Sequence, residues 1–410
     1  MKILIKNQNK FLKLDDNLRV VHYEDTKESY SQGRLTNLLL EDSDITILSI
    51  DDDSYKLDRD FGRDITIYSS IDKVLGYFIA ISPSISGTIV GLGEDNHVVF
   101  QIKKSADRQK LPPTVELYDH PYDSNYLLAY IRINQQGKAR SSIRDAYCNG
   151  NWNTFNSLVN LINIGGSVGL DNKLFSFYYP ERQQTLNGKY ISGYYRYELG
   201  YNTDEFRDLR ANPRCLIESQ FLTIRCYIDY FIHNGFIDKD TAVYLTGETT
   251  QLASVVKLIA DILHKTIYLP HSTIQERSIE HKYIPLLGIG LSDYFKHSNK
   301  RSFEELVKYR RNSYNHHINT PQSTPPLTPI LTPPSVTLNT QTSKLLTPVD
   351  EQFELPSISV DEQFHLPSQK HQDSDAYILP DEEISTIYES LIQEHKRLEH
   401  ISICHFNKFY

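Results

Sequence analysis

Hydrophobic and polar positions form short strand-like runs and two long helical stripes between residues 45 and 263. Runs rich in β-branched and aromatic residues predict strands at 45–48, 87–93, 97–102, 127–133, 174–179 and 242–245. A helix is predicted from Asn212, the expected capping residue, through Pro213 at the first helical position to Gly235. Its apolar stripe consists of Ile217, Phe221, Ile224, Ile228 and Phe231. A second stripe, from Leu252 to Leu263, predicts a helix that packs on a sheet. Strands mixed with crossover helices favour an α/β domain with a mixed sheet.

The pattern changes near residue 312, where proline, threonine and polar residues begin to dominate. Residues 313–378 are therefore expected to form a disordered Pro/Thr-rich linker. Within it, VDEQFELPS at 349–357 recurs as VDEQFHLPS at 360–368, either through slippage in a low-complexity segment or as a doubled docking peptide. Residues 379–410 are expected to hold a short amphipathic helix, from Asp381 to His400, and the terminus, because acids come first and bases last along an apolar stripe.

Composition narrows the class of protein. The 410 residues are 39% hydrophobic and 23% charged, which is enough to bury a core and to form two domains. A formal net charge of −9, without a basic block, argues against nucleic acid as a partner. The four cysteines lack paired spacing, no metal-ligand cluster stands out, and no window is apolar enough for a membrane span. A cytoplasmic protein is therefore expected, with no membrane partner.

Two glycine-bearing turns carry the candidate chemistry. VYLTGETTQLASVVKLIADILHKTIYLP, residues 243–270, is typical of a strand, a turn and a helix whose N-terminal amides could face a nucleotide, although such turns also serve only structure. IVGLGEDNHVVFQI, residues 89–102, predicts a hairpin whose turn begins with Gly91 and Gly93. The hairpin is expected in a different part of the sheet, so that the two turns face each other across a cleft.

These segments resemble landmarks of the FGGY carbohydrate kinases, most closely the fungal type of D-xylulose kinase. GLGEDNHVVF at 91–100 is similar to the phosphate-binding hairpin of that family, YCNG at 147–150 to the short motif that follows, and ESQFLTIR at 218–225 to a marker helix. TGETTQLASVVKLIADIL at 246–263 resembles the adenosine motif. The resemblance implies an actin-like ATPase (ribonuclease H-like) fold and nucleotide-binding positions Gly91, Gly93, Gly247, Glu248, Thr249 and Thr250. It also implies ATP and Mg²⁺ as cofactors if the protein is active, and possibly none if it is not.

The chain departs from the family pattern in ways that bear on catalysis. Residues 1–75 would be a shortened remnant of the family's N-terminal domain, and residues 76–312 its nucleotide-side domain. The first phosphate loop would fall at residues 3–8, which contain no acid, and no acid occurs at 77–90, where the catalytic base would lie. Glu94 and Asp95 stand where the family has hydroxyl residues, either as Mg²⁺ ligands or as an acidic turn that has lost its ligand. No residue is therefore assigned as catalytic or metal-binding.

Two functions follow as expectations. The first is a xylulokinase-like carbohydrate kinase by descent, which would transfer phosphate from ATP to D-xylulose or a related sugar but is catalytically impaired. The second is a non-catalytic binding or scaffold protein that meets a protein partner through residues 313–410. The short N-terminal region would reflect either true deletion or an incomplete gene model.

Overall fold

The structure is a computed structural model of the chain. It describes residues 2–7, 10–16, 18–26, 31–50, 56–57, 60–69, 73–81, 87–163, 173–269, 283–298, 302, 305–306 and 377–408. These residues fall within one unit that joins 1–314 to 374–410. The linker expected at 313–378 lies outside the described residues except for its last two positions.

An N-terminal sheet is built from five short strands in the order β3-β2-β1-β4-β5. The strands are β1 (Lys2–Asn7), β2 (Lys10–Leu14), β3 (Val20–Asp25), β4 (Ile45–Ile50) and β5 (Thr66–Ser69). β1 pairs antiparallel with β2 and parallel with β4. Alternation along β1 sends Leu4 into a core with helix α1 (Ser31–Glu41), while Ile3 and Ile5 enter a separate core. Both faces of this sheet are therefore covered.

A second sheet has seven strands in the order β15-β14-β13-β6-β7-β9-β8. The strands are β6 (Thr88–Leu92), β7 (Asn96–Lys103), β8 (Glu116–Asp119), β9 (Tyr126–Ile133), β13 (Val243–Thr246), β14 (Ile267–Tyr268) and β15 (Tyr377–Ile378). Its central strands β9-β7-β6-β13-β14 repeat the order and the relative directions of β3-β2-β1-β4-β5. The chain thus contains one five-stranded topology twice, and the mixed sheet expected from the sequence is present.

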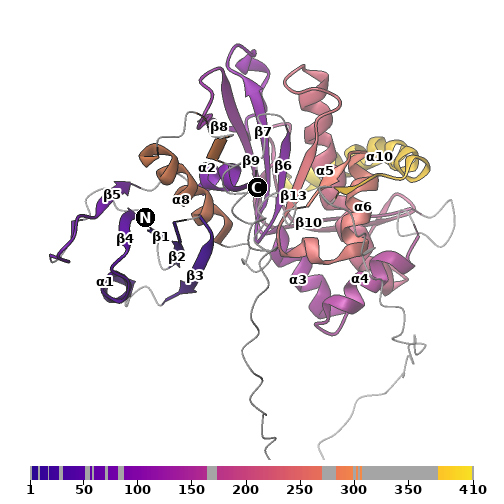
Figure 1. The fold of residues 1–410 in the computed structure, drawn as a ribbon. Helices are drawn as coiled ribbons and strands as arrows, with labels where there is room; N and C mark the ends of the chain where they lie inside the picture. Colours follow the sequence, from indigo (N-terminus) through magenta and orange to yellow (C-terminus); the bar gives the residue numbers. More distant parts are fainter. Residues whose placement is uncertain are drawn as a thin grey trace, which may run out of the picture. The chain divides into compact units, whose positions relative to one another are not determined.

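Helices and a β-hairpin cover the second sheet and supply most of its core (Figure 1). The helices are α3 (Gln136–Tyr147), α4 (Trp152–Leu161), α5 (Asn212–His233) and α6 (Ala253–Leu263). The hairpin of β10 (Leu174–Gln184) and β11 (Tyr190–Glu198) continues into β12 (Tyr201–Thr203). Phe231 of α5 stacks on Phe100 of β7, with ring centroids 4.0 Å apart. The apolar stripe of α5 therefore packs on the sheet. The helix that the sequence expected on a sheet is α6, which contacts α4, α5 and α10 as well as β15. The helix begins at Asn212 itself, so Ala211 is the capping position.

Helices α2 (Lys73–Ile81) and α8 (Ile284–His297) pack closely against each other. Gly288 of α8 lies against the backbone of Gly76, and a Cβ at Gly288 would overlap that backbone. α8 also contacts β1 and β2, so a helix that follows β14 of the second sheet in sequence packs on the first sheet. None of the described helices is both long and apolar enough to cross a membrane.

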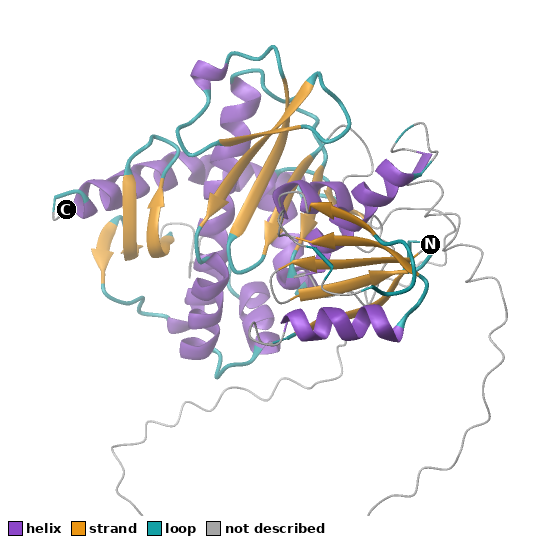
Figure 2. Ribbon diagram, turned by 90° about the vertical axis from the view of Figure 1, so that its left-hand side faces the viewer, coloured by secondary structure: helices purple, strands orange, loops and turns teal. Residues whose placement is uncertain are grey.

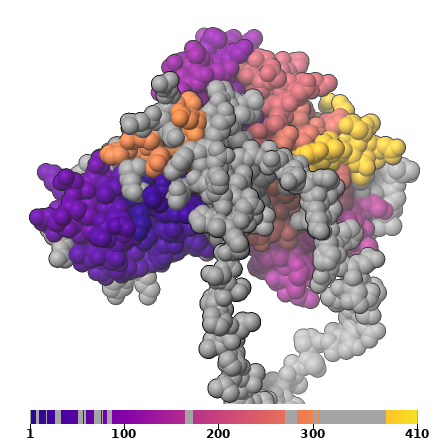
Figure 3. Space-filling view, in the orientation of Figure 1, coloured from indigo at the N-terminus to yellow at the C-terminus, as the bar shows by residue number. Residues whose placement is uncertain are grey.

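The C-terminal segment belongs to the second sheet and its core. Ile378 of β15 pairs with Ile267 of β14, so the last two residues of the expected linker are strand rather than disordered chain. Helix α10 (Glu382–Phe406) is capped by Asp381, as the acid-first pattern suggests, and ends six residues beyond the predicted His400. It packs on α5, α6 and β11, and Figure 2 shows it running to the C-terminus beside strands. Figure 3 shows it, in yellow, at the surface.

Candidate functional site

The two glycine turns lie on neighbouring strands. β6 and β13 are parallel, with Gly91 opposite Thr246, so the turn at Gly93–Asp95 and the turn that begins at Gly247 leave the same edge of the sheet. The expectation that they lie in different parts of the sheet and face each other across a cleft was therefore wrong. The crossover that returns through α5 places β13 directly beside β6, and the turns touch. Carboxyl ends of adjacent parallel strands are the usual place for a ligand in an α/β sheet.

Gly247 is needed because two backbones meet there. Its φ is +122°, and a Cβ on it would overlap the carbonyl group of Leu92. The following residues form a short 3₁₀ helix, Glu248–Gln251, in which the Thr250 hydroxyl donates to the Gly247 carbonyl over 2.7 Å. Thr249 is buried and Glu248 is exposed. The space beside Gly247, where the resemblance places a nucleotide, is thus occupied by the backbone of Leu92 at the end of β6.

The hairpin turn is bound to the start of α3. The Asp95 carboxylate accepts the Gln135 backbone N–H over 2.7 Å, and the Glu94 carbonyl accepts the Gly137 N–H over 2.7 Å. An acid at this position satisfies an amide at the helix N-terminus and meets the positive end of its dipole. Gly93 and the Glu94 side chain are exposed, whereas Gly91 lies buried within β6. Asp95 therefore has a structural role that neither sequence alternative contained.

A buried arginine beneath this turn was missed by the sequence reasoning. Arg140 of α3 is 2% exposed and donates to the Gly93 carbonyl over 2.8 Å. It also donates to the Asn96 and Gln220 side chains, each over 2.9 Å. Burial lowers the pKa of Arg140 to about 10. Nothing in the sequence pattern marked Arg140, because it occupies a buried position where a helix usually carries an apolar residue.

The marker helix contributes structure rather than chemistry. Gln220 donates to the Gln136 carbonyl over 3.1 Å and so ties α5 to the start of α3. Glu218 accepts from Arg214 over 2.8 Å and from Tyr388 of α10 over 2.6 Å. Arg225 donates to the Ile262 carbonyl of α6 over 2.9 Å. These contacts give Glu218 and Arg225 structural roles. The YCNG segment lies where α3 ends, at Tyr147, with Cys148 as its capping residue.

The chemistry available at the two turns is limited. Their exposed charged side chains include Glu94 and Glu248, and Asp95 is committed to α3. Within the described ranges, no cluster of three or more histidine, cysteine or acidic side chains could hold a metal ion. The resemblance places the catalytic base within residues 77–90, of which 82–86 lie outside the described residues. The described positions 78–81 and 87–90 of that segment are buried and hold no acid. The resemblance places the first phosphate loop at residues 3–8, of which Gln8 lies outside the described residues.

Comparison with known proteins places the fold. No protein-family model matches the sequence, and no curated protein matches it. Among solved structures, the ligand-bound xylulose kinase from Lactobacillus acidophilus has a TM-score of 0.53 at 12% identity, covering 85% of this chain and 54% of that one. The xylulose kinase from Rhodospirillum rubrum has a TM-score of 0.52 at 10% identity, with 84% and 54% covered. A gluconate kinase from Lactobacillus acidophilus has a TM-score of 0.50 at 13% identity, with 85% and 54% covered.

The chain therefore has the fold of these carbohydrate kinases and spans about half of their length, 54% in each of the three. At such low identity the likeness establishes the fold alone.

Proposed function

We propose that this protein is a carbohydrate kinase of the FGGY type by descent, closest to a xylulokinase, that is impaired in phosphate transfer. The fold shared with xylulose and gluconate kinases supports the descent. The two nucleotide turns expected from the sequence also lie together at the carboxyl edge of neighbouring strands, where a phosphate chain would pass. ATP, Mg²⁺ and a small sugar are the ligands that such an origin implies.

The proposed impairment of phosphate transfer rests on the side chains that the two turns present. Phosphoryl transfer depends on donors and cations arranged around the phosphates. Here Glu94 and Glu248 present negative charge at the edge where the polyphosphate would lie, and Asp95 is held by α3. Like charges roughly 4 Å apart repel by about 1 kcal/mol in water and about 4 kcal/mol in a partly desolvated site. Glu94 and Glu248 are exposed, so the lower figure applies to each. Since about 1.4 kcal/mol is tenfold in affinity, the two acids together would weaken ATP binding by about thirtyfold.

A nucleotide-binding assay tests this proposal. We expect no thermal shift of the full chain with millimolar Mg·ATP and no ADP release with D-xylulose, because a ligand that does not bind the native state cannot stabilise it. The double variant Glu94→Thr with Glu248→Gly removes both exposed acids, and we expect it to gain a measurable shift. The control is Glu389→Gln, which removes a charge at an exposed position of α10, outside both turns. A clear shift of the unaltered chain together with sugar-dependent ADP release would overturn the proposal.

The alternative is a scaffold that meets a protein partner through residues 313–410. The packing of α10 limits which of these residues a partner could contact. The buried face of α10, including Tyr388, Leu391 and Leu398, is used within the chain's own core. A partner would therefore have to meet residues 313–376, which lie outside the described residues, or the exposed face of α10. Pull-down with a chain lacking 315–373 against the full chain separates these two surfaces.

A further inference from the structure

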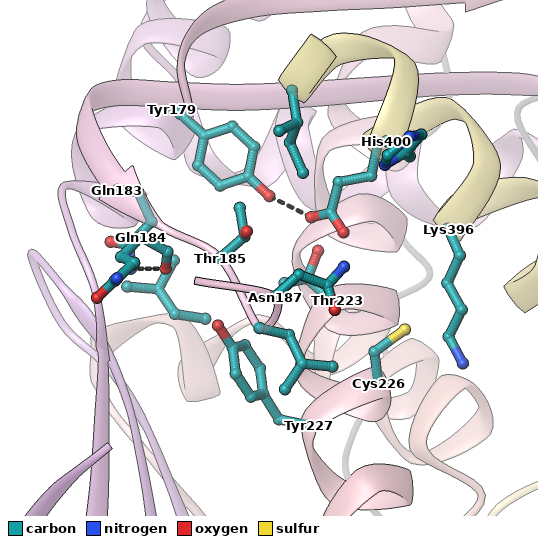
Figure 4. A pocket seen from close by; sticks show the side chains of 14 residues that line it. Tyr179, Gln183, Gln184, Thr185, Asn187, Thr223, Cys226, Tyr227, Lys396 and His400 are labelled. Atoms are coloured by element: carbon teal, nitrogen blue, oxygen red, sulfur yellow. Dashed lines mark hydrogen bonds between the residues drawn. The ribbon is translucent and has the colours of Figure 1, made fainter. Parts of the chain in front are cut away.

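A cavity of about 220 Å³ lies between α5, α10 and the loop that joins β10 to β11 (Figure 4). None of the turn residues Gly91, Gly93 and 247–250 lines it, so it is separate from the proposed nucleotide position. Its size is below that of pockets for drug-sized ligands, which run from about 300 Å³ upward. The cavity therefore suits a small molecule of a few non-hydrogen atoms.

A carboxylate from α10 forms one wall of the cavity. The Tyr179 hydroxyl donates to one Glu399 oxygen over 2.7 Å. Among the described residues no hydrogen bond reaches the other Glu399 oxygen, and Glu399 lines the cavity. Burial raises the pKa of Glu399, because the charged carboxylate is poorly solvated there. A cation in the cavity would offset that cost by pairing with the carboxylate.

The remaining walls favour a cation with a short polar or aliphatic chain. The buried side chains of Tyr179 and Tyr227 line the cavity, and tyrosine rings attract cations through their electron-rich faces. Thr185 and Asn187 add hydroxyl and amide groups on the loop side. Lys396 also lines the cavity, but it is exposed, so its charge is screened by solvent.

Covalent chemistry does not account for this arrangement. Cys226 is the thiol that lines the cavity, and burial raises its pKa to about 12. At neutral pH the thiol is therefore protonated and a poor nucleophile. The carboxylate and the two aromatic residues point to reversible binding instead.

We propose that this cavity binds a small protonated amine, with its ammonium group on Glu399 and its chain between Tyr179 and Tyr227. Since α10 contributes Glu399 and Ile403 to the wall while α5 contributes Tyr227, such a ligand joins the C-terminal helix to the core. Binding therefore stabilises the docked position of α10.

Three probes of one length test the proposal on the full chain. They are 4-aminobutan-1-ol, butane-1,4-diol and 4-hydroxybutanoate, which carry a cation, no charge and an anion at the same end. Ligand-observed NMR titration should give a dissociation constant in the millimolar range for the amine, at least tenfold below that of the diol, and no binding of the anion. The fragment size sets the modest affinity.

Variants separate the site from general effects on folding. Glu399→Gln should abolish the tenfold preference for the amine, whereas Glu389→Gln, an exposed acid on the same helix, should retain it. Asn187→Lys places a cation on an exposed loop position at the cavity and should weaken amine binding at least fivefold even if Glu399→Gln fails to fold. Lys396→Met should strengthen it. Equal binding of amine and diol, or unchanged amine binding in Asn187→Lys, would refute the proposal.

Discussion

The contact between α10 and α5 can be tested by removing one oxygen atom. Tyr388 is fully buried and its hydroxyl donates to Glu218 over 2.6 Å and accepts from Arg214 over 2.8 Å. Tyr388→Phe keeps the ring and therefore opens no cavity. It leaves one buried guanidinium N–H without its acceptor and removes one donor from a buried carboxylate. Hydrogen bonds to charged groups contribute about 1.5–3 kcal/mol each, so for the two bonds we expect a loss of about 3–6 kcal/mol in the free energy of unfolding.

Urea denaturation followed by circular dichroism measures this loss as a lower midpoint at an unchanged slope. Tyr377→Phe in β15 is the matched control, because Tyr377 is 52% exposed and its hydroxyl lies outside the core. We expect that control within about 0.5 kcal/mol of the unaltered chain. A loss below about 0.5 kcal/mol for Tyr388→Phe would mean that α10 is not held by this buried cluster, and the packing argument would be wrong.

Two further predictions concern His395 and Gly247. His395 is fully buried, and burial lowers its pKa to about 3, from about 6.5 in the unfolded chain. Between these two pKa values the unfolded chain binds a proton that the folded chain does not, so the free energy of unfolding falls as the pH falls. Between pH 7 and pH 5 the free energy of unfolding should fall by about 2 kcal/mol through His395. In His395→Leu this acid-induced loss should shrink by about 2 kcal/mol, whereas the exposed control His400→Gln should leave the loss unchanged. Gly247→Ala should cost more than about 3 kcal/mol in chemical denaturation, because the new Cβ meets the Leu92 backbone at a positive φ, whereas Gly33→Ala in α1, with open space around it, should not destabilise the chain.

Elements with a clean apolar period were predictable from the sequence. The six predicted strands correspond to β4, β6, β7, β9, β10 and β13, and the three predicted helices to α5, α6 and α10. Helix α3 was missed because its buried face carries Gln136 and Arg140 beside Ala139 and Ile143, so no continuous apolar stripe exists. Neighbouring side chains and backbone carbonyls compensate the burial of these polar groups. Such compensation arises only in the folded chain.

The two glycine turns were predictable from the sequence, but the residues that they contact were not. The glycines marked where β6 and β13 end, but not that these two strands are neighbours. Whether Gly247 makes room for a ligand or for Leu92 depends on the strand order, which places β13 beside β6. In the same way, Asp95 appears from sequence as an unexplained acid, and its partner at Gln135 lies forty residues away. Local sequence identifies a turn, but long-range pairing decides what the turn contacts.

Helix α5 connects the proposed nucleotide edge to the C-terminal segment through two residues of one turn. Glu218 and Gln220 are two positions apart, so their side chains lie about 200° apart around the helix and face nearly opposite directions. Glu218 binds Tyr388 of α10, and Gln220 binds Arg140 beneath the Gly93 turn. A segment resembling a kinase marker helix thus fixes the hairpin on one side and α10 on the other. Both contacts are with groups that carry no phosphate chemistry, so the structural role of this helix does not depend on whether the turns bind phosphate.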